Sequence, residues 1–234
     1  MTGKEERPGP GVPPTDDEAF KGSAVYTPWT LAFYDLVVLG ISNSVVWKCP
    51  SRSILNLYNE HVSDRHLDVG VGTGYFLDRC RFPSSSPTIA LFDLNRNSLA
   101  TTARRLRRYA PICHRGNVLQ PIDVGKSAFG SIGLNYLLHC LPGTLQTKSV
   151  VFAHLKPLMQ DHGVLFGSTI LGKDVPRSAL ARRLMNAYNA KGIFSNLADC
   201  PGELEAGLKE HFDDYKIRMI GCVALFSARK RGSV

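Results

Sequence analysis

Three glycines at alternate positions follow a short predicted strand and give the sharpest chemical signal in the sequence. The segment reads Asp68-Val69-Gly70-Val71-Gly72-Thr73-Gly74-Tyr75. Glycine lets a backbone turn tightly and lets a ligand approach without a Cβ in the way. In doubly wound α/β sheets, loops of this kind lie between a strand and a helix, where small ligands bind beyond the carboxyl ends of the strands. The loop therefore predicts a small-ligand site.

The glycine spacing disfavours two common phosphate-binding loops. A dinucleotide loop reads G-x-G-x-x-G, but Tyr75 holds the third glycine position here and the last glycine falls one residue early. A Walker loop ends in Gly-Lys-Ser/Thr, which does not follow these glycines. Asp68 stands two residues ahead of the first glycine, where a carboxylate would repel a pyrophosphate and attract a cation. S-adenosylmethionine, which carries an ammonium and a sulfonium, meets this requirement.

A second carboxylate, Asp93, ends the next predicted strand, in the segment Leu91-Phe92-Asp93-Leu94-Asn95. A carboxylate at a strand tip can accept hydrogen bonds from both hydroxyls of a ribose, which is a charge-assisted bidentate contact. The alternative role for Asp93 is the N-cap of the following helix. Together with the glycine loop, its position favours ribose binding.

The two motifs together resemble the class I S-adenosylmethionine-dependent methyltransferases, over about residues 60 to 230. Within that class the chain is similar to the small-molecule enzymes of quinone and secondary-metabolite biosynthesis. The resemblance implies S-adenosylmethionine as cofactor, with Asp68, Gly70 and Gly72 along its methionine moiety. It also implies that Asp93 holds the ribose and that Leu94 packs on the adenine.

Further site residues, and two departures, follow from the same resemblance. Asn117, followed by Val118, would meet the adenine amino group, where the family usually has an aspartate; asparagine keeps an acceptor oxygen. Asn135 would end the fourth strand beside the sulfonium. Gly130 replaces a common aspartate, and residues 160–163 replace a common Pro-Gly-Gly. Both departures are expected away from the pocket, so they bear on stability more than on chemistry.

The acceptor side is marked by three weaker signals. His139, after the fourth strand, could take a proton from a phenol, alcohol or amine near neutral pH, or could instead orient the loop before Pro142. Tyr26, in the aromatic segment 26–39, is expected to reach the cofactor carboxylate, with helix packing as its alternative. The segment 178–196 is expected to roof the acceptor site, or to serve packing alone.

These residues need a scaffold of alternating strands and helices. The pattern predicts strands over 66–69, 88–92, 114–117, 129–134, 164–170, 215–219 and 221–228. It predicts helices over 51–61, from the glycine loop to about residue 80, and over 97–109, 149–159, 178–190 and 202–212, with Asn97 as a cap. Such alternation favours an α/β fold, a doubly wound, Rossmann-like, mainly parallel seven-stranded sheet. The last two strands have no helix between them, so they predict an antiparallel C-terminal hairpin.

Length and composition fit one soluble domain. We expect a disordered, proline-rich tail over 1–22 and a single domain over 23–234, which includes a helical N-terminal cap over 23–62. Six scattered cysteines form no C-x-x-C pair, which indicates neither a metal site nor a redox motif and favours the cytoplasm. Neither a signal peptide nor a membrane span is indicated.

The net charge of +8 raises the alternative of a nucleic-acid substrate. Its densest cluster, Arg104, Arg105, Arg107 and Arg108, is read either as a solvated helix face or as an anion-binding surface. The segment from Asn135 lacks the Asn/Asp-Pro-Pro-aromatic motif of enzymes that methylate base nitrogens. We therefore expect a small-molecule acceptor, with O-methylation favoured. An RNA methyltransferase and a non-catalytic S-adenosylmethionine-binding protein stay open as alternatives.

Overall fold

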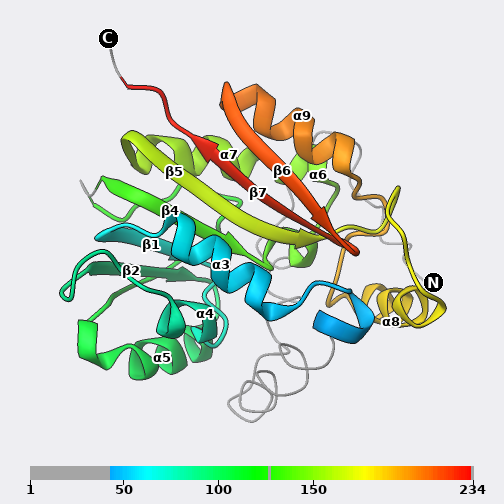
Figure 1. The fold of residues 1–234 in the computed structure, drawn as a ribbon, viewed down its shortest axis with the longest axis horizontal. Helices are drawn as coiled ribbons and strands as arrows, with labels where there is room; N and C mark the ends of the chain where they lie inside the picture. Colours follow the sequence, from blue (N-terminus) through cyan, green and yellow to red (C-terminus); the bar gives the residue numbers. More distant parts are fainter. Residues whose placement is uncertain (1–42, 126–127, 233–234) are drawn as a thin grey trace, which may run out of the picture.

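A seven-stranded sheet forms the centre of the computed structural model, which describes residues 43–125 and 128–232 (Figure 1). The strands are β1 (Arg65–Val69), β2 (Thr88–Asp93), β3 (Ile112–Arg115), β4 (Phe129–Asn135), β5 (Met159–Ile170), β6 (Asp214–Ile220) and β7 (Val223–Arg229). Their order is β3-β2-β1-β4-β5-β7-β6. The first five strands pair in parallel, and β7 pairs antiparallel with both β5 and β6. The predicted fold class, including the antiparallel C-terminal hairpin, is confirmed.

The strand order reverses in the middle of the sheet. From β1 the chain moves to β2 and β3 at one edge, then returns to place β4 on the other side of β1. The connections that follow β1 and β4 therefore leave the sheet in opposite directions and open a crevice at the strands' carboxyl ends. The glycine loop, which follows β1, lies at this crevice.

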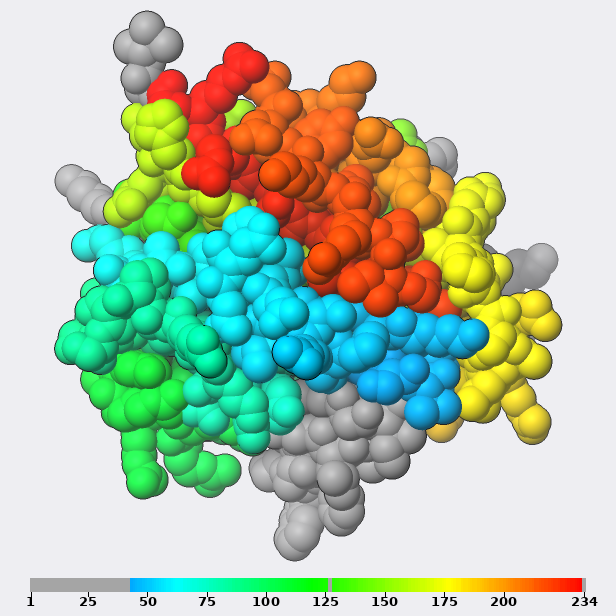
Figure 2. Space-filling view, viewed as in Figure 1, coloured from blue at the N-terminus to red at the C-terminus, as the bar shows by residue number. Residues whose placement is uncertain are grey.

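Helices cover both faces of the sheet. They are α3 (Ser51–His61), α4 (Tyr75–Arg79), α5 (Arg96–Arg105), α6 (Leu145–Lys148), α7 (Val150–Leu155), α8 (Ala179–Ala190) and α9 (Pro201–His211), with 3-10 turns η2 (Arg107–Tyr109), η3 (Leu138–Cys140) and η4 (Lys156–Leu158). In Figure 1, α3 crosses in front of the sheet and α7 lies behind it. The space-filling view shows α3 and the segment before it, in cyan and blue, as a band between α4 and the orange-red side chains of β6 (Figure 2).

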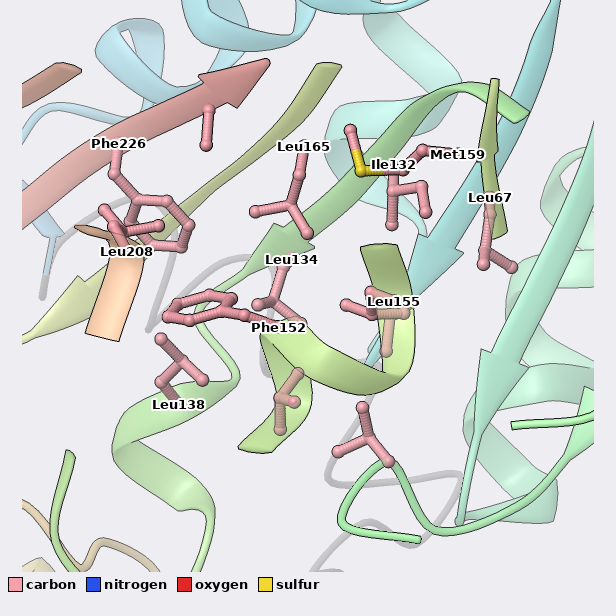
Figure 3. Close-up of a cluster of buried hydrophobic side chains, with 14 of the residues drawn as sticks. Leu67, Ile132, Leu134, Leu138, Phe152, Leu155, Met159, Leu165, Leu208 and Phe226 are labelled. Carbon is pink, nitrogen blue, oxygen red and sulfur yellow. The ribbon is translucent and has the colours of Figure 1, made fainter. Parts of the chain in front are cut away.

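Two hydrophobic cores, one on each face, result from the alternation of side chains along the strands. Behind the sheet, Phe152 of α7 packs against strand residues such as Leu134 and Phe226 (Figure 3). The front core joins α3, α4, α5 and α8 to the opposite side of the strands. In β1, Leu67 belongs to the rear core, whereas its neighbour Asp68 belongs to the front side. This alternation decides which side chains of β1 can meet α3.

Three predicted details are wrong. The third strand runs two residues earlier than 114–117, because its exposed edge position removes the apolar pattern that marks the other strands. The predicted helix 149–159 is split into α7 and the 3-10 turn η4, and β5 already begins at Met159, where it pairs with Phe129 beyond a β-bulge. The cap of α5 is Asn95, not Asn97, because the Asn95 side chain accepts the N–H groups of Asn97 and Ser98 at 2.8 and 3.3 Å.

The predicted tail over 1–22, the aromatic segment 26–39 and Tyr26 lie outside the described residues. Within the described ranges, no helix is long and apolar enough to cross a bilayer. All six cysteines are free.

Candidate active site

One cavity lies at the carboxyl ends of β1, β2 and β4 and brings most of the predicted site residues together. Its lining includes eight of the nine predicted cofactor residues, namely Asp68, Gly70, Gly72, Asp93, Leu94, Asn117, Val118 and Asn135. These residues come from four separate segments of the chain. The ninth, Tyr26, is not among the described residues, and His139 is not part of the described lining.

The three loop glycines all have left-handed backbones, with φ of +71°, +54° and +70° at Gly70, Gly72 and Gly74. A Cβ on Gly70 would lie 2.8 Å from a methyl of Leu137, and a Cβ on Gly74 would lie 2.7 Å from a methyl of Thr102. A Cβ on Gly72 would meet no atom within 4 Å. Gly70 and Gly74 are thus required by packing as well as by φ, whereas Gly72 faces open space in which a ligand can approach the backbone.

Side chains of helix α5 hold the glycine loop by hydrogen bonds. The Thr102 hydroxyl donates to the Gly72 carbonyl at 3.2 Å, and the Arg105 guanidinium donates to the Thr73 hydroxyl at 3.2 Å. Arg108 donates to the side chain and the carbonyl of Asp78 in α4, at 2.5 and 2.8 Å. Two members of the basic cluster therefore hold the glycine loop and α4 in place, which favours the reading of this cluster as a helix face over that of a polyanion surface.

Asp93 ends β2 beside the glycine loop. Its Oδ1 accepts the backbone N–H of Asn95 at 2.8 Å. Burial raises the pKa of the Asp93 carboxyl to about 6, and the nearby backbone N–H groups of Asn95, Gly72 and Val71 oppose that rise. Because Asn95 caps α5, the alternative role of Asp93 as the helix cap is wrong. A desolvated carboxylate that faces a cavity is well placed to accept hydroxyl donors from a ligand.

Asp68 lies one strand away, 4% exposed, in the front face of β1. Its Oδ2 accepts the Tyr58 hydroxyl at 2.7 Å and lies 3.3 Å from Nε2 of His66. Tyr58, from α3, also lines the cavity. The cavity thus has a carboxylate at each of two neighbouring strand ends.

The far end of the cavity, after β3, is mainly apolar. Leu94 and the buried Val118 contribute hydrophobic surface. A Cβ on Gly116 would lie 2.6 Å from the Phe92 ring, so the chain needs a glycine to pass there. Asn117 accepts the backbone N–H of Leu119 at 3.1 Å through its Oδ1. This end suits a flat apolar ring with polar edges.

At the end of β4, the backbone makes a sharp turn into the cavity. Asn135 accepts the Ser168 hydroxyl at 3.0 Å through Oδ1, and its buried Nδ2 has no hydrogen-bond partner in the described part of the chain. Tyr136 has a left-handed φ of +53°, and its N–H donates to the Ser168 carbonyl at 2.8 Å. This turn lets Asn135, Tyr136 and Leu137 all line the cavity.

His139 lies behind this turn, in η3, with 3% of its surface exposed. Its Nδ1 accepts the backbone N–H of Ile170 at 3.3 Å, and its ring packs edge-on against Phe194 at a centroid distance of 4.6 Å. Burial, and then the charge of Lys148, lowers the pKa of His139 to about 3. The imidazole is therefore neutral and engaged in packing.

The region beyond His139 is held by polar groups that satisfy one another. The buried Lys148 ammonium donates to Asp199 Oδ2 at 2.7 Å and to the Ser195 carbonyl. Asp199 Oδ1 accepts the N–H of Leu145 at 3.1 Å. In the segment expected to roof the acceptor site, Met185 of α8 is buried, and no residue of α8 lines the described cavity.

Sequence reasoning missed several residues that line the cavity: Tyr58, Tyr75, Ser98, Cys140, Leu141 and Pro142. Tyr75 had a local signal, because it directly follows Gly74. Tyr58 had none, since only the packing of α3 across the sheet brings it to the site. Among the described residues, no group of three or more His, Cys, Asp or Glu side chains is placed to hold a metal ion.

Comparison with known proteins gives consistent relatives. Demethylluteothin O-methyltransferase from Streptomyces thioluteus is 38% identical over 213 residues, which cover 91% of this chain and 93% of that protein. Methyltransferase verB from Penicillium polonicum is 39% identical and covers 88% of this chain and 96% of its own length. Human N-acetylserotonin methyltransferase, solved with S-adenosylmethionine, superposes with a TM-score of 0.60 at 17% identity, over 95% of this chain and 61% of that one. No protein-family model matches the chain.

Proposed function

The chain belongs to the S-adenosylmethionine-dependent methyltransferases, and we propose that it methylates a hydroxyl oxygen of a small secondary metabolite. The observation that carries this proposal is that two carboxylates, Asp68 and Asp93, line one cavity beside a glycine loop with open space at Gly72. Relatives that span most of the chain support the oxygen acceptor, since demethylluteothin O-methyltransferase and a physcion biosynthesis cluster O-methyltransferase are among them.

The residues of the cavity fit the cofactor. Bound S-adenosylmethionine supplies a methyl group activated by its sulfonium. Asp93 would accept hydrogen bonds from the ribose hydroxyls. These would take the place of the hydrogen bonds that water donates to an exposed carboxylate. Leu94 and Val118 would contact the adenine faces, and the Asn117 amide would meet the adenine amino group.

At the other end of the cavity, Asp68 would face the methionine ammonium. The free Nδ2 of Asn135 is a buried donor at the end of β4, available to an oxygen of the ligand. Asp68 and Asn135 both line the cavity, and a few polar groups on a mainly apolar wall are typical of a small-ligand site. Tyr26 stays a prediction for the cofactor carboxylate.

His139 serves best as a positioning residue. A general base must reach the acceptor proton, whereas His139 is not part of the described lining and its Nδ1 accepts the backbone N–H of Ile170 in β5. The protein's main contribution is then to orient the acceptor and exclude water, which can supply several orders of magnitude in rate. An acidic hydroxyl that ionises near neutral pH needs no base.

We place the enzyme in the cytoplasm, as a single domain over 23–234 behind the tail 1–22. Its six free cysteines are consistent with a reducing compartment. The contacts of Arg105 and Arg108 with α4 and the glycine loop favour a small-molecule acceptor over a nucleic acid.

The test is incubation with methyl-labelled S-adenosylmethionine and a fractionated extract of small metabolites, followed by mass spectrometry. We expect label in one class of hydroxylated metabolites as a methyl ether, and far less label with an Asp93→Asn variant when the cofactor is limiting. Label in added RNA instead would overturn the acceptor assignment. Tight binding of S-adenosylhomocysteine without transfer to any fraction would support the non-catalytic alternative.

A further inference from the structure

We propose that Tyr58 and His66 form a clamp that fixes one oxygen of Asp68 and so presents the other oxygen to the ammonium group of the cofactor. Both are positioning residues, since they act through Asp68 and not on the reacting atoms. The inference rests on the proposed function, because it assumes that S-adenosylmethionine occupies the cavity.

The clamp follows from the alternation of β1. His66 and Asp68 are two residues apart on one strand, so their side chains lie on the same face of the sheet. The Tyr58 hydroxyl, from α3, lies 2.7 Å from Asp68 Oδ2, and His66 Nε2 lies 3.3 Å from the same oxygen. All three side chains are at most 4% exposed. Two donors from different elements therefore meet at one carboxylate oxygen.

Room for this arrangement comes from the neighbouring strand. Gly133 of β4 lies directly beside Asp68 in the parallel pairing. A Cβ at Gly133 would lie 2.9 Å from Asp68 Oδ2 and 3.2 Å from Cε1 of His66. Any larger residue would thus push apart the two groups that the clamp joins.

A carboxylate oxygen can only accept, so the contact of His66 with Asp68 Oδ2 is a hydrogen bond when His66 carries a proton on Nε2. Ser131 Oγ accepts the N–H of Ser63 at 2.8 Å and lies 2.8 Å from His66 Nδ1. When the Ser131 hydroxyl donates to Nδ1, the neutral imidazole carries its proton on Nε2 and donates it to Asp68. Burial, and then the Asp68 charge, raises the pKa of Tyr58 well above its usual value. Tyr58 therefore stays a donor as well.

The consequence is an asymmetric carboxylate. Oδ2 receives both donors, while no described residue donates to Oδ1, and Asp68 lines the cavity. A fixed carboxylate with one open oxygen binds an ammonium better than a freely rotating one, because the cost of ordering is already met in the free protein. The effect should be confined to ligands that carry the ammonium.

This confinement separates the clamp from a merely structural role. S-adenosylhomocysteine carries the amino-acid end, whereas 5′-methylthioadenosine retains the adenosine and sulfur but lacks the ammonium. General damage to the pocket weakens both ligands, but loss of the clamp weakens only the first. The ratio of the two affinities is therefore the informative quantity.

The experiment is calorimetry with both ligands on the full chain and on Tyr58→Phe and His66→Leu variants. We expect S-adenosylhomocysteine to bind about tenfold more weakly to each variant, and 5′-methylthioadenosine to change by less than about twofold. His66→Gln, which retains an N–H donor near the position of Nε2, should recover part of the loss. His61→Leu, on α3 but away from Asp68, is the matched control and should change neither affinity.

A second arm uses Asp68→Asn as background, where His66→Leu should no longer change the ratio of the two affinities. Equal losses for both ligands in Tyr58→Phe, or an unchanged ratio in all clamp variants, would overturn the clamp. Tyr58→Phe is nearly isosteric and keeps the test valid where His66→Leu unfolds. Failure of the wild-type chain to bind either ligand would instead contradict the proposed function itself.

Discussion

Two regions of the protein, one lining the cavity and one behind it, differ in how their buried polar groups are hydrogen-bonded. At the ends of β1 and β2, Asp68 and Asp93 are desolvated and keep hydrogen-bonding capacity open toward the cavity. Beyond β4, His139, Lys148 and Asp199 are also buried, but they bond to one another or to the backbone. Burial alone therefore does not identify a functional residue in this protein.

The two regions differ in what their buried polar atoms bond to. Polar atoms at the cavity can still form hydrogen bonds with a ligand, whereas those behind β4 are bonded within the protein. An unmet buried polar group costs stability, so proteins retain it mainly where a ligand or catalysis uses it. A buried group that is fully paired contributes to the fold instead. The comparison predicts that mutations of Asp68 and Asp93 lower ligand affinity. Mutations of His139, Lys148 and Asp199 should instead lower stability. Four experiments test this distinction.

The largest effect is expected for Lys148→Met, among the buried groups that bond within the protein. Its loss leaves the Asp199 carboxylate buried without its cation, which should lower the free energy of unfolding by about 3–5 kcal/mol. Urea denaturation measures the change, and the affinity of the folded protein for S-adenosylhomocysteine should stay the same. The double variant Lys148→Met/Asp199→Leu removes both charges and should recover much of the loss. A weakened affinity in the single variant would break the division.

The next largest effect is expected for Asp93→Asn, among the residues that line the cavity. The loss of a charged acceptor for two ribose hydroxyls should weaken S-adenosylhomocysteine binding by roughly 100-fold. The melting temperature should not fall, because burial already disfavours the charged carboxylate. Calorimetry and thermal denaturation together provide the test. A variant that binds normally but melts early would place Asp93 with the structural groups.

A pH titration sharpens the same assignment. Because the pKa of Asp93 is raised to about 6, the carboxyl is mostly ionised at pH 7 and mostly protonated at pH 5. If the ribose binds the ionised form, S-adenosylhomocysteine affinity should fall about tenfold between pH 7 and pH 5. The Asp93→Asn variant serves as the control and should show a flatter profile over this range.

The smallest effect on catalysis is expected for His139→Asn. Asparagine Oδ1 can take the place of Nδ1 as acceptor for the Ile170 N–H, so stability should fall by only about 1 kcal/mol. Turnover at saturating substrates should stay within about twofold of wild type, whereas the loss of a general base costs about 10²–10⁴-fold. A drop of that size would restore His139 as the base.

The residues that line the cavity were easier to predict from the sequence than the paired groups behind β4, for a physical reason. Loop glycines and strand-end carboxylates carry their signal in local order, since the φ values of Gly70 and Gly72 and the place of Asp93 depend on nearby residues. The partners of His139 come from β5 and from residue 194, about 30 and 55 positions further along the chain. No local pattern shows whether such a histidine will be paired.

The same distinction between local and distant contacts explains which parts of the fold could be predicted from the sequence. Strands with apolar runs and the final hairpin are predictable from pattern, and the sheet is as expected. The bounds of the exposed edge strand β3 and the split of the predicted helix into α7 and η4 depend on tertiary packing instead. The clamp residue His66 had a usable signal, because the period of two along β1 places it with Asp68. Tyr58 had no such signal.

The left-handed backbone of Tyr136 has a consequence for the evolution of this enzyme. A non-glycine residue in that region costs about 1 kcal/mol. Glycine would relieve this cost but would remove an aromatic ring that packs against His139 and the front core and lines the cavity. Packing and the cavity wall therefore both favour an aromatic residue at this position, and substitutions that raise thermal tolerance should be selected at other positions.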